Sequence, residues 1–145
     1  MCHVCRKKLT RVAPRISRLS TSGLMISAGI ILVAGSRVLI LQGAMTGVWS
    51  FPKGHPELVD NGSALMTAVR EAYEETGYVP GVDYTLGEQR RLGKRKYWVS
   101  YPIRGLAVPK LDPIEHRAWR WATADEIKWL NVNSDVDKWA KSNRF

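Results

Sequence analysis

The most regular pattern of apolar and polar positions in the chain predicts a helix between residues 64 and 76. Apolar side chains recur there at the i, i+3, i+4, i+7, i+8 spacing of a buried helical stripe, at Leu65, Ala68, Val69, Ala72 and Tyr73. The Ser63 hydroxyl can accept a hydrogen bond from the backbone of the first turn, and Gly77 suits the left-handed position after the last turn. We therefore expect the helix to begin after Ser63, to end before Gly77 and to pack this stripe against the core.

Shorter apolar runs on both sides of this helix predict strands and two further helices. A hairpin around Gly93 joins two of the five expected strands, which cover residues 25–33, 37–42, 84–91, 96–104 and 118–121. Thr123 and Ser134 are the expected caps of short helices at 124–130 and 135–142. This order of elements alone indicates an α+β or α/β fold.

The polar side of the long helix carries three carboxylates close together. Glu71, Glu74 and Glu75 fall within roughly a third of the helix circumference. Like charges at i,i+4 destabilise an isolated helix by about 0.2 to 0.5 kcal/mol per pair, whereas hard cations such as Mg²⁺ require clustered oxygen ligands. We interpret the cluster as a metal site, and the alternative is a solvated charged face.

These helix residues resemble the signature of the Nudix hydrolases, which is Gly, five residues, Glu, seven residues and then Arg-Glu-apolar-x-Glu-Glu-x-Gly-apolar. The second half of the signature is matched by Arg70, Glu71, Ala72, Glu74, Glu75, Gly77 and Tyr78. The first half is similar in the string from Trp49 to His55. This resemblance is highly specific in its second half.

The spacing between the two halves differs from the signature. Gly54 lies sixteen residues before Arg70, which is two more than the signature has. Counting forward from Gly54 assigns the outlying acid to Asp60, whereas counting back from Arg70 reaches Gly62 and finds no carboxylate. Glu57 and Asp60 are therefore both candidates for this auxiliary acid.

The resemblance implies an α/β/α sandwich with a mixed β-sheet, and hydrolysis of a pyrophosphate bond in a nucleoside diphosphate linked to another group. It also implies Mg²⁺ or Mn²⁺ as cofactor, which would neutralise charge that develops on the phosphate oxygens. In this scheme Arg70 orients the carboxylates, and the metal site is built from Gly54, Glu71, Glu74 and Glu75.

Glu115 is a second candidate for catalysis. It precedes the last expected strand, where many Nudix hydrolases carry a carboxylate that acts as general base or as an extra metal ligand. Glu71 is the rival for the role of base, and a loop salt bridge is the structural alternative for Glu115.

Two strings point to different substrates within the family. Glu115-His116-x-Ala118-x-Arg120-Trp121 is similar to the diadenosine tetraphosphate hydrolases, whereas Val38 to Gly43 and Trp49 to Gly54 resemble mRNA-decapping enzymes. The hypothesis leans to dinucleoside polyphosphates. The alternatives are an RNA 5′-end pyrophosphohydrolase, a diphosphoinositol polyphosphate hydrolase and a catalytically weak binding module.

Several basic residues are candidates for substrate contacts. Arg95 and Lys96 run directly into Tyr97 on the expected hairpin, and basic groups beside aromatics can hold phosphates and stack bases. The alternative is that the aromatics face the core and the cations keep the hairpin turn soluble. Lys53 is a better phosphate ligand than His55, because its charge does not change near pH 7.

Composition divides the chain into a basic extension and one domain. With 145 residues and 45% hydrophobic content, a single domain with one core is expected at residues 23–145. The net charge is +9, yet residues 1–22 alone carry six basic side chains and no acid. This extension is interpreted as a phosphate-binding tail, a mitochondrial presequence or a flexible solubilising segment.

Cysteine content and hydropathy give expectations about compartment. Cys2 and Cys5 form a C-x-x-C without the second pair that a structural zinc site needs. With two cysteines and no secretory pattern we expect an intracellular protein, in the cytoplasm unless residues 1–22 direct it to mitochondria. The apolar run Leu24 to Ala34 is too short to span a bilayer and predicts a buried strand. The oligomeric state stays open.

Overall fold

The structure is a computed structural model that describes residues 26–143. Its elements, in chain order, are β1 (Ala28–Ala34), β2 (Arg37–Gly43), β3 (Trp49–Ser50), β4 (Lys53–Gly54), the 3₁₀ turn η2 (Leu58–Asp60), α3 (Ala64–Thr76), β5 (Tyr84–Leu92), β6 (Arg95–Pro102), β7 (His116–Ala122), α4 (Ala124–Ile127) and α5 (Ser134–Asn143). The basic extension 1–22 with Cys2 and Cys5 lies outside the described residues.

The strands form a mixed sheet, as the resemblance implied. The main path runs β3-β2-β1-β6-β5, and β4 and β7 pair with β1 and β2. β1 and β6 are parallel, with Ala28 opposite Lys96 and Leu32 opposite Ser100. The other strand pairs are antiparallel, including the expected hairpin of β5 and β6. The short strand β4 therefore reaches the N-terminal end of β1, where its two residues lie opposite Ala28 and Gly29.

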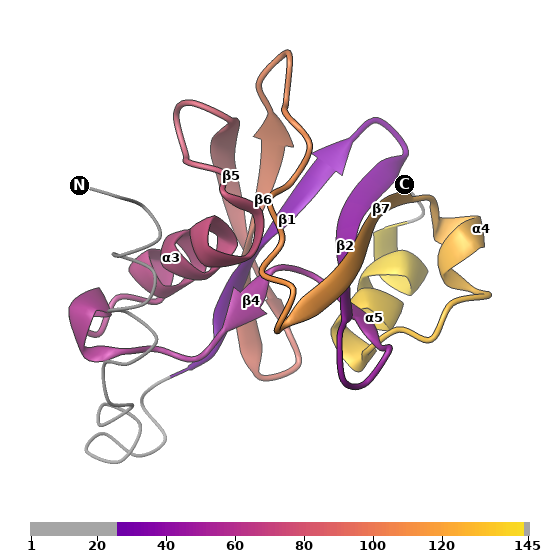
Figure 1. Ribbon diagram of the computed structural model, residues 1–145, viewed down its shortest axis with the longest axis horizontal. Helices are drawn as coiled ribbons and strands as arrows, with labels where there is room; N and C mark the ends of the chain where they lie inside the picture. Colours follow the sequence, from indigo (N-terminus) through magenta and orange to yellow (C-terminus); the bar gives the residue numbers. More distant parts are fainter. Residues whose placement is uncertain (1–25, 144–145) are drawn as a thin grey trace.

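Helices cover both faces of this sheet (Figure 1). Successive side chains of a strand point to opposite faces, so Ile30 and Leu32 of β1 pack on the side of α3, while Ile31 packs on the side of α5. On the α5 face, Phe51 contacts Tyr97 and Trp139 edge to face. The α/β/α sandwich predicted from the resemblance is thus confirmed.

α3 has the predicted ends but not the predicted buried stripe. The Ser63 side chain accepts from the Met66 backbone N–H, and Gly77 has φ 82°. Ala68 and Ala72 are buried against the sheet, as expected. The rest of the stripe is only half-buried, at Leu65, Val69 and Tyr73, while the acids on the neighbouring side of the helix are buried, at Glu71, Glu74 and Glu75. The reason is that α3 packs against β4 and η2 as well as β1, so the loop before the helix covers its acidic side.

The C-terminal helices are shorter or begin differently from the expectation. Thr123 caps α4 as predicted, accepting from the Glu126 backbone N–H, but the helix ends at Ile127. Ser134 is the first residue of α5 and not its cap, because the Asn133 side chain accepts from the Val136 backbone N–H. None of the described helices is long and apolar enough to cross a membrane.

Candidate active site

Arg70 on α3 lies at the centre of a network that joins the helix to the loop before it. Its Nε donates to Asp60 Oδ1 at 2.9 Å, and its Nη2 donates to Asp60 Oδ2 at 3.0 Å. This paired geometry is the strongest form of an arginine–carboxylate contact. A third bond runs from Arg70 Nη2 to the backbone carbonyl of His55 at 2.8 Å. Arg70 thus holds both ends of the segment between β4 and η2.

Asp60 is the acid that the structure places against Arg70, as the forward count from Gly54 indicated. The two extra residues relative to the signature are accommodated in the turn after it, where Asn61 and Gly62 both have positive φ, 52° and 75°. Asp60 is also tied to the chain around it, because it accepts from the Glu57 backbone N–H at 2.9 Å and from the Thr67 hydroxyl at 2.8 Å. Asp60 therefore fixes the loop to α3.

Glu57, the other auxiliary candidate, lies in the same network. It is buried, and its Oε2 is 3.8 Å from Arg70 Nη1. Both candidate acids therefore face the guanidinium group, Asp60 at hydrogen-bonding distance and Glu57 farther away.

The guanidinium group also reaches two of the three acids in the signature. Arg70 Nη1 donates to Glu71 Oε2 at 3.1 Å and to Glu74 Oε2 at 3.3 Å. Burial opposes the positive charge of Arg70, but the hydrogen bond to Asp60 and the nearby carboxylates raise its pKa well above the usual value. The guanidinium is therefore a permanent cation, and it orients these side chains.

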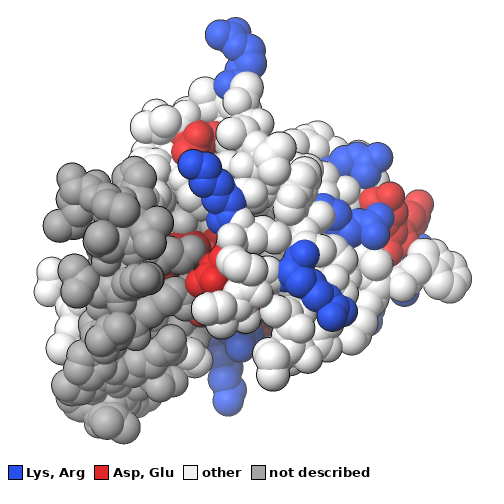
Figure 2. Space-filling view, viewed as in Figure 1, with Lys and Arg blue, Asp and Glu red and all other residues white. Residues whose placement is uncertain are grey.

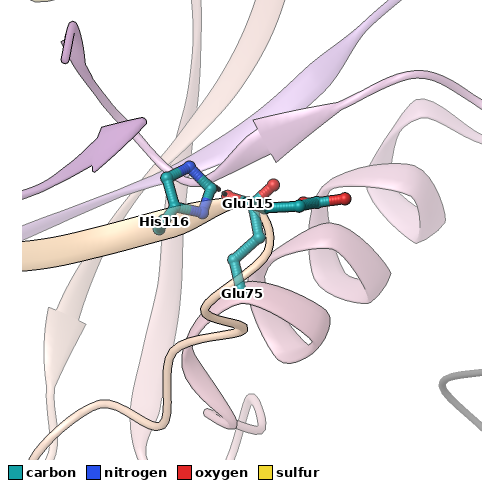
Figure 3. Close-up of side chains that lie close together, drawn as sticks. All are labelled: Glu75, Glu115 and His116. Atoms are coloured by element: carbon teal, nitrogen blue, oxygen red, sulfur yellow. Dashed lines mark ion pairs between the residues drawn. The ribbon is translucent and has the colours of Figure 1, made fainter. Parts of the chain in front are cut away.

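Glu75 lies outside this network and meets residues from the other end of the fold. Its carboxylate, that of Glu115 and the imidazole of His116 offer ligand atoms that all lie within 4.8 Å of one another (Figure 3). His116 Nε2 is 4.0 Å from Glu75 Oε1, which also accepts from the Lys53 backbone N–H at 3.3 Å. Glu75 comes from α3, His116 is the first residue of β7, and Glu115 directly precedes it. Residues separated by forty positions thus form one cluster.

Sequence reasoning did not identify His116 as a site residue. In a regular strand, neighbouring side chains point to opposite faces, but Glu115 lies in the turn just before β7 and His116 is its first residue. Opposite His116, the pairing of β2 with β7 shifts register between Gln42 and Gly43. Such irregularities redirect side chains near functional sites. The sequence does contain a signal for His116, because it directly follows Glu115. That pair was interpreted as a subfamily similarity and not as two ligands of one metal.

Burial and mutual repulsion change the acidity of the glutamates. Burial raises the pKa of Glu71 to about 7, with Glu74 and Glu115 adding to the rise and Arg70 opposing it. Burial, with Glu71 and Glu115 next, also raises the pKa of Glu75 well above its usual range. The charged forms of Glu71 and Glu75 are thus incompletely compensated by the chain itself, and a bound cation would complete the compensation.

Position 54 has room for glycine only, because the Glu71 carboxylate lies against its backbone. A Cβ atom at this position would lie 2.0 to 2.3 Å from the carboxylate atoms of Glu71. The backbone of β4 therefore runs directly against this carboxylate, which explains the glycine of the signature in this chain.

The cluster of Glu75, Glu115 and His116 fits a divalent metal ion. Its two carboxylates and its imidazole are the oxygen and nitrogen donors that divalent first-row metals accept.

Most of the predicted site residues line one cleft of about 380 Å³. It is lined by Lys53, Gly54, His55, Glu71, Glu75, Arg95, Glu115 and His116, together with Met45 and Ile114. Figure 2 shows carboxylates gathered near the centre of one face, with Lys and Arg side chains around them. His55 is exposed, and its Nδ1 lies 3.0 Å from the Ser27 hydroxyl. Glu74 does not line the cleft.

The hairpin residues proposed to bind substrate are separated by the structure. Arg95 lines the cleft, whereas Lys96 is partly exposed and does not. Tyr97 is fully buried, and its hydroxyl donates to Asp135. The prediction that Tyr97 contacts substrate is wrong, because the helix layer of α5 covers its face of the sheet.

The sequence pattern of the NUDIX domain matches residues 23–141. The chain belongs to the Nudix family. As a Nudix hydrolase it acts on pyrophosphate bonds, and the cluster of glutamates and His116 is a site that could hold the divalent metal this family typically uses.

Solved Nudix structures share the fold at low sequence identity. An Ap4A hydrolase from C. elegans, in a binary complex, is 22% identical with a TM-score of 0.64, over 79% of this chain and 92% of that chain. A Nudix hydrolase from M. smegmatis is 20% identical with a TM-score of 0.62, over 81% and 82% of the two chains. An ADP-ribose pyrophosphatase from Streptococcus suis is 15% identical with a TM-score of 0.56, over 78% and 82%. Proteins whose names give different substrates thus resemble this chain to a similar degree, and these similarities do not fix its substrate.

Proposed function

We propose that this Nudix hydrolase cleaves a phosphoanhydride bond in a nucleoside-diphosphate-linked substrate, with dinucleoside polyphosphates as the preferred class. The observation that carries the proposal is the composition of the cleft. Its acidic and imidazole ligands lie beside the cations Lys53 and Arg95, and its lining also includes two exposed apolar side chains, Met45 and Ile114. Phosphates would contact the cations, and a nucleobase would pack on the apolar pair.

Mg²⁺ or Mn²⁺ is the proposed cofactor, held by Glu75, Glu115 and His116 with Glu71 beside them. When bound, such ions would neutralise phosphate oxygens and activate the attacking water. Glu74 is the weakest candidate ligand of the signature, because it is bonded to Arg70 and does not line the cleft. Its proposed role is to help hold Arg70.

Glu115 is the proposed general base, with one carboxylate oxygen holding the metal and the other taking the proton. Burial raises the pKa of Glu71, the rival, to about 7, but its Oε2 is already engaged because it accepts a hydrogen bond from Arg70 at 3.1 Å. Glu115 is not bonded to Arg70 and is only half-buried, so a water in the cleft can approach it. In this scheme Lys53 and Arg95 position the phosphate chain, and His55 contributes through its backbone carbonyl to Arg70.

The burial of the hairpin aromatics weakens the argument for RNA ends. RNA bases can stack only on aromatic rings that are exposed on the protein surface. Tyr97 is buried, and Trp98 packs partly against the apolar residues between the sheet and α3. Tyr101, which is 45% exposed, is the remaining candidate on β6. RNA decapping and diphosphoinositol polyphosphate hydrolysis therefore stay as alternatives, and each is tested with its own substrate.

A substrate panel tests the proposal. The full chain, with Mg²⁺ and separately with Mn²⁺, is assayed on diadenosine polyphosphates, capped RNA, diphosphoinositol polyphosphates and ADP-ribose. We expect the highest kcat/KM for a diadenosine polyphosphate, and loss of that activity in Glu75→Gln. The matched control is Glu88→Gln, which removes an exposed carboxylate on β5. A tenfold preference for capped RNA would contradict the proposed substrate class, and no turnover of any compound would favour the binding module.

A further inference from the structure

A second cleft, which we call the basic cleft, adjoins the active site. It has a volume of about 680 Å³, and most of its lining comes from the turn that joins β5 to β6 and from the N-terminal end of α5. These two segments lie near each other in the fold (Figure 1). Arg91, Lys94, Arg95 and Lys138 line it, and Asp135 is the one carboxylate in its lining. Four cationic side chains thus surround a space that the hydrolytic residues do not occupy.

The single acid of the basic cleft is already neutralised within the fold. Asp135 is 1% exposed, accepts from Arg95 Nη1 at 3.0 Å and accepts from the Tyr97 hydroxyl. It therefore cannot serve as counter-ion for the other cations.

The other three cations have no counter-ion in the described part of the chain. Among the residues that the structure describes, Arg91, Lys94 and Lys138 form no hydrogen bond and no ion pair through their side chains. All three are exposed. Lys138 also lies close to the turn, since its Nζ would be 3.1 Å from a Cβ atom at Gly93. Uncompensated like charges around one hollow attract anions and are relieved by binding one.

The basic cleft adjoins the catalytic cleft. Ser27, His55 and Arg95 line both of them. Arg95 thus stands between the metal-binding glutamates on one side and the three uncompensated cations on the other. An anionic chain bound at the glutamates can pass Arg95 and enter the basic cleft.

We propose that the basic cleft binds the phosphate groups of a small-molecule substrate that lie beyond the anhydride being cleaved. The enzyme then prefers multiply phosphorylated substrates over nucleoside diphosphate sugars such as ADP-ribose. This inference rests on the proposed pyrophosphohydrolase function. No Phe, Tyr or Trp of the described residues lines the basic cleft, and its cations outnumber the one ring there, that of His55. The cleft is therefore suited to phosphate charge more than to bases. That argues for a compact polyphosphate and against single-stranded RNA, whose binding combines phosphate contacts with stacking.

Binding of inorganic tripolyphosphate tests the cleft without catalysis. The Kd is measured by calorimetry on the full chain with EDTA, which removes metal from the active site. We expect Lys94→Gln/Lys138→Gln to raise this Kd about tenfold or more, as expected for loss of charge-assisted contacts. The control, Arg104→Gln/Lys110→Gln, removes two exposed cations beyond the other end of β6 and should stay within about twofold. Equal Kd values in wild type and both variants would overturn the proposal.

Kinetics with two phosphate sources then identify what the cleft holds. The ratio of kcat/KM for diadenosine pentaphosphate to that for ADP-ribose should fall about tenfold in Lys94→Gln/Lys138→Gln. The same ratio for a diphosphoinositol polyphosphate falls instead if the extra phosphates belong to an inositol ring. A loss confined to capped RNA, with unchanged tripolyphosphate binding, would overturn the proposal in favour of an RNA surface. If wild type hydrolyses none of these compounds but tripolyphosphate binding still depends on Lys94 and Lys138, the proposed function fails and the anion site stands.

Discussion

Two neighbouring glutamates of α3, Glu74 and Glu75, belong to groups of charged side chains with opposite electrostatic situations. Asp60 and Glu74 are bonded to Arg70, a cation supplied by the chain. Glu75, one residue farther along the helix, instead faces Glu115 and His116, and burial among these groups raises its pKa. The first group is neutralised by folding. The second group could hold a metal ion that would neutralise it. The same residue type thus fixes the loop before α3 at one position and faces a candidate metal site at the next.

The comparison predicts its largest effect at Glu75. Glu75→Gln keeps the shape of the side chain but removes a charge from the cluster, so turnover should fall about 10²- to 10³-fold at saturating Mg²⁺. Mn²⁺ binding, followed by electron paramagnetic resonance, should weaken in parallel. Glu74→Gln should lower turnover less, because Glu74 contacts Arg70 and does not line the cleft. Equal losses in both variants would remove the distinction between the two groups.

Substitutions among the acids bonded to Arg70, Asp60 and Glu74, should lower the stability of the fold. Asp60→Asn breaks a buried, paired contact with Arg70, and breaking such a pair costs about 3 kcal/mol or more. Urea unfolding of the metal-free protein measures this loss. The control is Asp125→Asn, which affects a carboxylate that is 90% exposed and should change the free energy of unfolding by less than about 0.5 kcal/mol. A similar small change in Asp60→Asn would show that the network does not hold the loop.

A substitution at Glu115 tests whether this residue is the general base. Glu115→Gln should lower kcat about 100-fold, in the range of a lost general base, with a smaller change in KM. The expected split between kcat and KM distinguishes this role from phosphate binding. If kcat stays within a few-fold of wild type, the base is Glu71.

Local signals in the sequence located α3 and the hairpin, while contacts between distant segments decided what the sequence could not. The ends of α3 follow from Ser63 and Gly77, which act on their own neighbours. Which side of α3 is buried depends on a loop that packs back on it, and therefore Tyr73 was wrongly placed in the core stripe. The approach of His116 to Glu75 depends on the pairing of β7 with β2.

The signature predicted Glu71 and Glu75, which line the cleft, and Glu74, which does not. The forward count from Gly54 reached Asp60, the acid that lies against Arg70. Strand alternation could not show that α5 would cover Tyr97, because the same aromatic pattern on β6 suits a buried or an exposed face.

Replacing His116 should have a smaller effect, which is to change the relative affinity of the site for Mn²⁺ and Mg²⁺. Imidazole suits first-row transition metals better than Mg²⁺, which prefers oxygen ligands. His116→Asn should therefore weaken Mn²⁺ binding about tenfold while changing Mg²⁺ binding less. Competition between the two ions, read by the Mn²⁺ resonance signal, measures the ratio directly. An unchanged ratio would place the metal on the glutamates alone.

The smallest expected effect is on the pH dependence of stability without metal. The pKa of Glu71 is about 7 in the folded protein, against 4.5 ordinarily, and that of Glu75 is also raised. Below about pH 4.5 both glutamates are protonated in either state. As pH rises from 4.5 to 7 the unfolded chain ionises them first, so the free energy of unfolding falls.

With EDTA, we therefore expect Tm to be lower at pH 7.5 than at pH 5 by about 3 °C or more, since one pKa unit corresponds to 1.36 kcal/mol. Glu75→Gln should reduce this difference and raise Tm at pH 7.5, and saturating Mn²⁺ should raise the wild-type Tm at that pH because the ion binds the folded state. Glu88→Gln on exposed β5 is the control and should leave the difference unchanged. A metal-free protein that becomes more stable across this pH range, with no change in Glu75→Gln, would mean that folding already neutralises both groups of acids.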